Sequence, residues 1–142
     1  MKKPKIYSYN QAIYPVKLDV IFDDIDEDTL NKLYGWASNP TVKLECDAIN
    51  KFGDTYDDLY NKKTHSRTIL VLFYEEPTVE CIAHEAFHVM NGVMKAADLE
   101  FDADESAGNE HLAYLLQWIV YSISNALEEH KKSKKKKHVR KS

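Results

Sequence analysis

The feature that most constrains the fold is a pair of histidines four residues apart in an otherwise apolar segment. His84 and His88 enclose Glu85 in the string His-Glu-Ala-Phe-His, within residues 78–94. On an α-helix, residues four apart lie on one face, so both imidazoles are able to reach one point. Burying two histidines and a glutamate unpaired on so apolar a helix is unfavourable, and a metal ion relieves that penalty. The segment is therefore predicted to be a metal-binding helix.

Zinc is the metal that suits these side chains. Zn²⁺ binds His nitrogens at about 2.0–2.1 Å in a tetrahedral shell, and a catalytic zinc keeps three protein ligands and one open position for water. Glu85 follows the first histidine and is expected to project beside the metal without binding it. There its carboxylate is placed to take a proton from that water. We therefore expect His84 and His88 as zinc ligands and Glu85 as the catalytic base.

A second helix carries the string Gly-Asn-Glu-His-Leu-Ala-Tyr, with Glu110 near its start. His-Glu-Ala-Phe-His followed by Asn-Glu-x-x-Ala-Tyr resembles the gluzincins, the thermolysin-like zinc metallopeptidases. The closer resemblance is to compact zincins of small bacterial and phage proteins. It covers about residues 78–121 and implies Glu110 as the third zinc ligand.

The resemblance has one departure and leaves rivals for the third ligand. Gluzincins have Asn-Glu-x-x-Ser-Asp, whereas Ala113 and Tyr114 stand at the last two positions here, so the Asp that supports a zinc-bound histidine has no counterpart. Glu105 in the polar loop 100–108 is one rival to Glu110. His111 is another and would give a three-histidine site. Neighbours on a helix point about 100° apart, so Glu110 and His111 are not both expected to bind the metal.

The resemblance implies hydrolysis of peptide bonds in a peptide or protein substrate, which would add as an extended strand at a sheet edge beside the cleft. The reaction also needs a donor to the developing oxyanion, and His65, His111 and Tyr114 remain open for that role. Two other classes of function stay open. One is a zinc-bearing accessory protein or inhibitor without peptidase activity, and the other is a metal-free interaction module.

The whole chain indicates one α+β domain. Its 142 residues, of which 44% are hydrophobic, suffice for a single core. Apolar runs predict a small sheet of about three strands, at 13–22, 41–49 and 68–74. An early helix is expected after Asp26 or Asp28, ending before Pro40, and Thr78 is expected to cap the metal helix. Residues 50–66 are expected to be a long loop beside the cleft. With the metal helix and an apolar helix at 112–127, these elements make a minimal zincin-like domain.

Charge is divided unevenly along the chain. Eight of the 19 Lys and Arg lie in 131–142, which has no acid, so the preceding residues hold 11 basic and 23 acidic residues, a net charge of −12. An acidic body is not the pattern of a nucleic-acid-binding domain. The domain is expected to span 1–130, with no apolar face beyond Leu127. Residues 131–142 are predicted to be a disordered Lys-rich tail, whose contact with nucleic acid would be non-specific.

The compartment follows from the cysteines and the amino end. Cys46 and Cys81 are far apart and are predicted to be free thiols of a reducing compartment. No apolar run approaches the length of a membrane span, and the first residues lack the apolar core of a signal peptide. We therefore expect a cytoplasmic chain without membrane contact.

Overall fold

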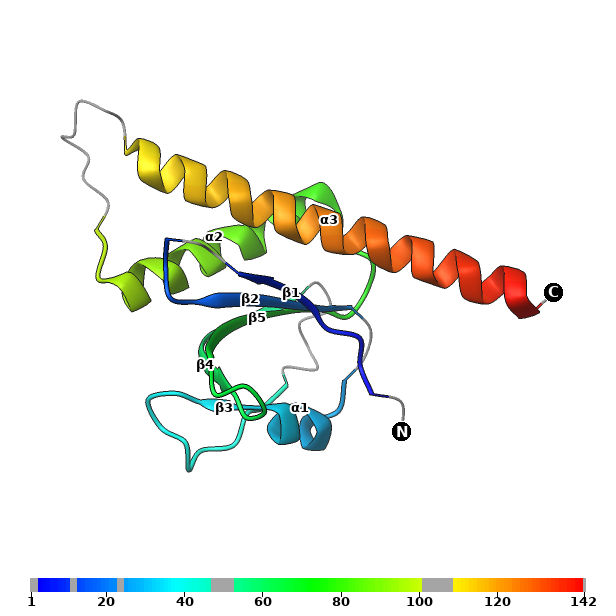
Figure 1. Cartoon of the computed structure of the whole chain (residues 1–142), viewed down its shortest axis with the longest axis horizontal. Coiled ribbons are helices and arrows are strands. Elements are labelled where there is room, and N and C mark those ends of the chain that lie inside the picture. Colours follow the sequence, from blue (N-terminus) through cyan, green and yellow to red (C-terminus); the bar gives the residue numbers. More distant parts are fainter. Residues whose placement is uncertain (1–2, 11–12, 23–24, 47–52, 101–108, 142) are drawn as a thin grey trace.

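The structure, a computed structural model, describes residues 3–10, 13–22, 25–46, 53–100 and 109–141, with side chains as far as Lys136. That part of the chain forms five strands and three helices (Figure 1). The strands are β1 (Tyr7–Asn10), β2 (Lys17–Phe22), β3 (Tyr34–Trp36), β4 (Asp54–Asn61) and β5 (Arg67–Phe73). The helices are α1 (Glu27–Leu33), α2 (Val79–Ala97) and α3 (Glu110–Lys141).

The strands form one mixed sheet in the order β1-β2-β5-β4-β3. β2 and β5 are parallel, and every other neighbouring pair is antiparallel. β5 is central, and its residues from Thr68 to Phe73 are buried, as expected for a strand covered on both faces. The β1 and β3 edges are short, which limits the exposed backbone.

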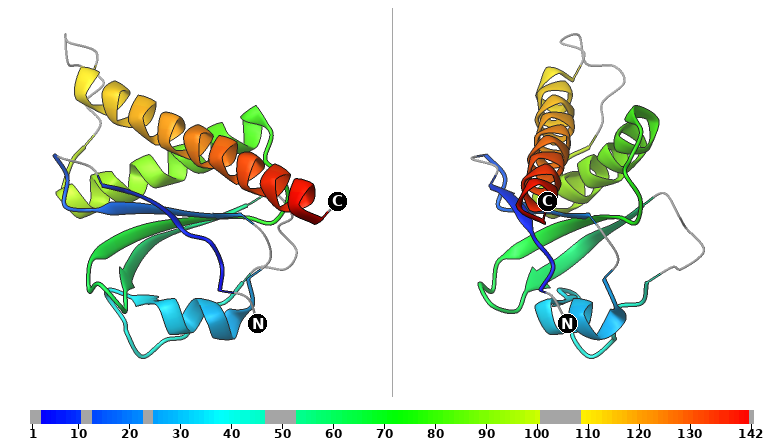
Figure 2. Two further views of the ribbon diagram at one scale, coloured as in Figure 1. Left: turned by 45° about the vertical axis from the view of Figure 1, so that its right-hand side comes forward. Right: turned by 90° about the vertical axis from the view of Figure 1, so that its right-hand side faces the viewer.

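Helices cover both faces of the sheet (Figure 2). α2 and α3 lie on one face, over a core that includes Val20, Val71 and Ile119. α1 lies on the other face, over a smaller core around Leu30 and Leu59. The α+β class expected from the sequence is confirmed, with five strands in place of about three.

Two helix starts follow the expected capping. The Asp26 carboxylate accepts a hydrogen bond from the Thr29 backbone N–H at 2.7 Å, and α1 begins at the next residue. The Thr78 hydroxyl accepts one from the Cys81 N–H at 3.3 Å, and α2 begins at Val79. These caps satisfy backbone donors that the helices themselves leave unpaired.

Two of the three predicted strands correspond to real strands, the third forms no strand in its described part, and one predicted loop contains a strand. The segments 13–22 and 68–74 contain β2 and β5. In the predicted strand 41–49, the described residues 41–46 form no strand, and 47–49 lie outside the described residues. The predicted loop 50–66 contains β4. A bulge between Tyr56 and Leu59 breaks the alternation of side chains, so the strand has no period-two pattern in the sequence.

The early helix is shorter than predicted, because Tyr34–Trp36 leaves it to form β3. Tyr34 is fully buried, and its hydroxyl donates to Asp19 Oδ2 at 2.6 Å. Asp19 is also fully buried and accepts a second bond from the Ser8 hydroxyl at 2.6 Å. A buried carboxylate needs such donors, so this contact favours the extended backbone at Tyr34 over a further helical turn.

α3 continues to Lys141, where the sequence led us to expect a disordered tail from residue 131. Lysine is a good helix former, and the helix is already established before the tail begins. Packing also extends past Leu127. His130 is buried, its Nδ1 lies 3.2 Å from the Tyr7 hydroxyl, and its ring stacks on Phe22 at 4.9 Å. The division of the chain at residue 130 stays a prediction.

Within the described parts of the chain, no helix combines the length and the apolar character needed to cross a bilayer. α3 has the length, at 32 residues, but its second half is rich in lysine.

Candidate functional site

The two histidines of α2 lie side by side on its exposed surface. His84 Nε2 and His88 Nε2 are 3.3 Å apart, and both side chains are exposed. Nitrogens that bind one zinc at about 2.0–2.1 Å with a tetrahedral angle lie about 3.3 Å from each other. The pair therefore has the separation that a shared zinc requires. The same separation suits a hydrogen bond from one ring to the other.

Glu85, the residue after His84, is buried, whereas the two histidines are exposed. Its side chain is only 4% exposed, and its Oε2 accepts a hydrogen bond from the Thr55 hydroxyl of β4 at 3.3 Å. Burial raises the pKa of the Glu85 carboxyl above its ordinary value, against the opposing effect of His84 and His88. A raised pKa makes the carboxylate a better proton acceptor, which suits a general base.

The histidine pair lies on the flank of α2 that is next to β4. Gly92 and Lys95 follow His88 by four and seven residues and so share its flank of α2. Lys95 Nζ pairs with Asp57 of β4 at 3.2 Å. A Cβ atom on Gly92 would lie 2.8 Å from the Asp57 Cβ and 2.9 Å from Ile69 Cδ1. α2 thus approaches β4 closely at Gly92, and this approach sets where Glu85 and the histidines stand over the strand.

We expect Gly92→Ala to destabilise the protein by up to about 2 kcal/mol, measured by urea unfolding. Alanine favours a helix over glycine by about 1 kcal/mol. Overpacking against the Asp57 Cβ, which is fixed to the β4 backbone, costs about 1–3 kcal/mol, and it also pushes α2 away from β4. Asn91→Ala is the matched control, since it adds helix propensity at a half-buried position and is expected to stabilise the protein slightly. A Gly92→Ala protein as stable as that control would contradict the close approach.

The structure does not gather Glu110 with the histidine pair. Among the described residues, no three His, Cys, Asp or Glu side chains form a group able to hold a metal. Glu110 is the first residue of α3 and is exposed, as is His111. Glu105 lies outside the described residues. The third ligand stays a prediction.

Two features of the helix packing explain this separation. α3 runs antiparallel to α2. The ion pair at 3.0 Å between Lys131 of α3 and Glu76, just before α2, shows this direction. Glu110, the first residue of α3, therefore lies toward the end of α2 at Ala97. His88 is nine residues before Ala97, about 13 Å along the axis of α2. α2 also packs on β5 and β4, whereas α3 packs on α2 and β2. α3 thus lies on the side of α2 that is away from β4 (Figure 2). The flank of α2 next to β4 is the one that carries the histidines.

The candidate oxyanion donors are also placed away from the pair. His65 lies in the turn between β4 and β5, with a φ of 58°. α2 follows the other end of β5, about 20 Å along that strand. His111 and Tyr114 lie in the first turns of α3, beside Glu110, and Tyr114 is 66% exposed.

No family model matches the chain, and neither a curated protein nor a solved structure matches it. The resemblance to gluzincins thus rests on the two motifs alone.

Sequence reasoning missed Thr55, Asp57 and Gly92, which hold Glu85 and α2 in place. Thr55 and Asp57 fall in the stretch predicted to be a loop, where adjacent acids and the bulge hide a strand. Gly92 was a feature of the sequence that could have indicated the close contact between α2 and β4. A glycine inside a strongly apolar helix lowers helix propensity and often marks a close backbone contact.

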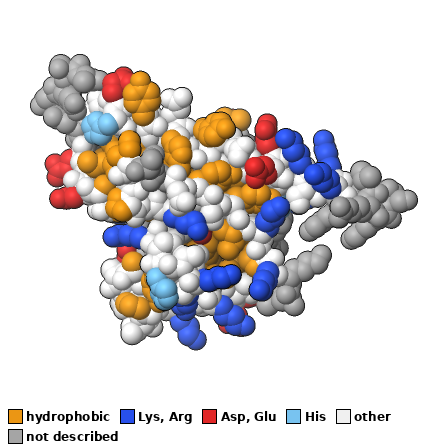
Figure 3. All heavy atoms as spheres, in the orientation of Figure 1, with side chains coloured by type: hydrophobic (Ala, Val, Ile, Leu, Met, Phe, Trp, Pro, Cys, Tyr) orange, Lys and Arg blue, Asp and Glu red, His pale blue; other side chains and the backbone are white. Residues whose placement is uncertain are grey.

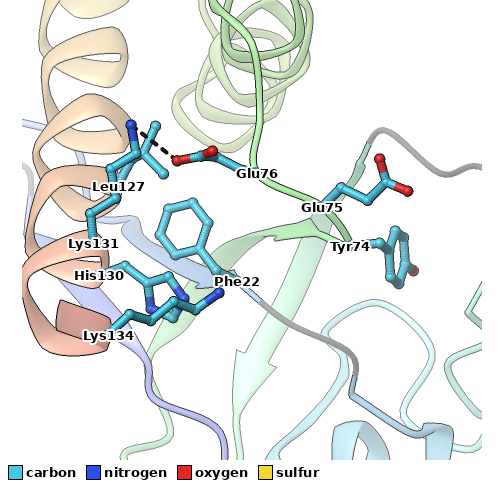
Figure 4. A pocket seen from close by; sticks show the side chains of 8 residues that line it. All are labelled: Phe22, Tyr74, Glu75, Glu76, Leu127, His130, Lys131 and Lys134. Atoms are coloured by element: carbon cyan, nitrogen blue, oxygen red, sulfur yellow. Dashed lines mark ion pairs between the residues drawn. The ribbon is translucent and has the colours of Figure 1, made fainter. Parts of the chain in front are cut away.

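A separate cavity of about 220 Å³ opens where β2 and β5 end (Figure 4). Phe22 and Leu127 are apolar residues of its lining, His130 lies beside them, and the ion pair between Glu76 and Lys131 also lines it. Neither histidine of the pair lines it, so it is distinct from the candidate metal site.

Proposed function

We propose that the chain is a zinc-dependent hydrolase that cleaves peptide bonds in a peptide or protein substrate. His84 and His88 hold the zinc through their Nε2 atoms, and Glu110 is the third ligand. The single observation that carries the proposal is the 3.3 Å separation of the two Nε2 atoms directly beside the buried Glu85. Bound zinc supplies a Lewis acid that polarises the carbonyl and makes water acidic.

Glu85 moves the proton in this reaction. Its carboxylate accepts the proton of the attacking water and passes it to the leaving amine. The Thr55 hydroxyl holds one oxygen of Glu85, so the other oxygen is the one available for proton transfer. Burial removes competing water from the carboxylate and keeps it a strong acceptor.

β4 offers a place for the substrate backbone. β3 pairs with β4 only through Leu59–Asn61, so Thr55 and Tyr56 lie beyond the end of β3. A peptide that added to β4 there as a strand would pass the flank of α2 that carries the histidine pair. Its main chain would be held by the strand whatever its sequence, while side-chain pockets would add selectivity.

Glu110 can bind the zinc only if the packing of α3 changes. This requirement favours a second candidate function. The absence of a three-ligand group among the described residues and the hydrogen-bonding distance between the rings fit a metal-free or accessory protein that keeps the motif. Zinc content separates the hydrolase from a metal-free protein, and hydrolysis of peptide bonds separates it from a zinc-bearing accessory protein. For either one, the two free thiols, Cys46 and Cys81, suit a cytoplasmic location.

The test measures zinc stoichiometry by equilibrium dialysis and mass spectrometry, together with hydrolysis of unfolded casein. We expect one zinc per chain in the natural protein. Loss of a group that only supports a ligand typically weakens metal binding by about 10- to 100-fold. Glu110→Ala should weaken zinc binding by more than this, and His111→Ala should leave zinc binding unchanged. The reverse result, or an effect of Glu105→Ala alone, would reassign the third ligand. A natural protein without stoichiometric zinc would overturn the proposed function.

A further inference from the structure

The part of α3 beyond His130 carries the densest positive charge in the chain and forms the end of the helix that leaves the body. From Lys131 to Lys141 there are eight Lys and Arg and no acid. The backbone is helical throughout, so they lie along about 16 Å at 1.5 Å per residue. This is one positive charge for about every 2 Å, close to the one negative charge per about 1.7 Å of duplex DNA.

The helix is fixed at the point where it leaves the body. His130 is buried against Phe22 and Tyr7, and Lys131 pairs with Glu76 at 3.0 Å (Figure 4). The C-terminal end of α3 then extends past the sheet (Figure 1). The lysines thus stand on a preformed helix before any partner binds, which lowers the entropy lost on binding.

The exposed lysines beyond His130 cover a little more than half of the circumference of the helix. Five of them, at 131, 132, 134, 135 and 136, are exposed, while Ser133 between them is half-buried. At 100° per residue they cover about 200° of the circumference. Figure 3 shows Lys side chains gathered where α3 leaves the body. A flat protein surface would meet only one side of such a helix, whereas the major groove of DNA has phosphates along both walls and is wide enough for a helix.

The extension also separates the basic helix from the acidic body. The residues before 131 carry a net charge of −12 and repel a polyanion. In 0.15 M salt that repulsion is screened over about 8 Å, roughly half the length of the extension. Phosphates along the outer part of the helix are therefore beyond most of the repulsion.

We propose that α3 beyond His130 is a duplex-DNA-binding helix that contacts phosphates without sequence preference. This binding is a second activity, separate from the proposed hydrolysis and independent of zinc. Lysines four apart repel one another along a free helix, and the phosphates of a bound duplex relieve that repulsion.

The test follows the fluorescence anisotropy of a 20-base-pair duplex of arbitrary sequence, titrated with the full chain at several salt concentrations. We expect log K to fall with log salt with a slope between about −4 and −7, as for five to eight phosphate contacts. The triple variant K132Q/K135Q/K136Q keeps helix-forming residues and should bind about 100-fold or more weakly in 0.1 M salt. Its slope should be less steep by about 3.

The matched control removes the same charge from exposed positions of the body, in K32Q/K43Q/K63Q. It should bind DNA within about twofold of the natural chain. Equal weakening in both triple variants would show that net charge sets the affinity and would overturn the proposal. A duplex RNA, whose major groove is too narrow for a helix, and poly-glutamate should each bind at least about tenfold more weakly. Equal binding of either, or binding that does not depend on salt, would also overturn it.

Discussion

Glu85→Gln is expected to lower the rate of casein hydrolysis by about 100- to 10,000-fold and to leave one zinc bound per chain. Glutamine has the shape of glutamate but accepts no proton at neutral pH. Its amide oxygen still accepts the Thr55 hydrogen bond, so the position of α2 over β4 is unchanged. The loss should appear in kcat, because the group acts in the proton transfer and not in binding the substrate.

Stability provides a second readout of the same variant. The Glu85 side chain is 4% exposed, and burying a charged carboxylate is unfavourable, whereas a neutral amide avoids most of that penalty. The zinc-free variant is thus expected to have a Tm equal to or higher than that of the natural protein. Glu80→Gln, at an exposed position on the same helix, is the control and should change neither rate nor zinc content. Full hydrolysis by Glu85→Gln would assign the proton transfer to another group.

His84→Ala and His88→Ala are each expected to abolish stoichiometric zinc binding, with the dissociation constant rising more than about 100-fold. Loss of a ligand should exceed the about 10- to 100-fold loss seen when a supporting group is removed. Both side chains are exposed, so the apo fold should persist, with a slight gain because alanine is the better helix former.

The effect of zinc on thermal unfolding measures this change directly. A ligand present at about 100 times its dissociation constant stabilises the native state by about 2.7 kcal/mol. Zinc should therefore raise the Tm of the natural protein and leave that of either alanine variant unchanged. His65→Asn is the control, because asparagine tolerates the positive φ of that turn. A zinc-dependent rise in Tm in both alanine variants would place the metal elsewhere.

Local signals in the sequence predicted the parts of the fold that depend on near neighbours. The uninterrupted apolar run before Glu75 identified β5, since a fully buried central strand needs no alternation. Asp26 and Thr78 identified two helix starts, because a cap is completed within three residues. The side-by-side imidazoles of His84 and His88 needed only the helical repeat.

Parts that depend on distant partners were not predictable in this way. β4 reads as an acidic loop, because its bulge and its two adjacent aspartates conceal a strand that only the pairing with β5 stabilises. Tyr34 leaves the early helix because its hydroxyl reaches Asp19, fifteen residues earlier. Nothing near Tyr34 in the sequence indicates that contact.

The sequence by itself determined the helix that carries the histidines, their spacing and the class of the fold, because each follows from periodicity within a few turns or strands. Only the tertiary structure decided what surrounds them. Packing buries Glu85 under Thr55, brings α2 onto β4 at Gly92, and carries Glu110 to the far end of α2. It also continues α3 beyond the body. These placements depend on how the helices cross the sheet, which is a balance of contacts over the whole core and not a property of any one segment.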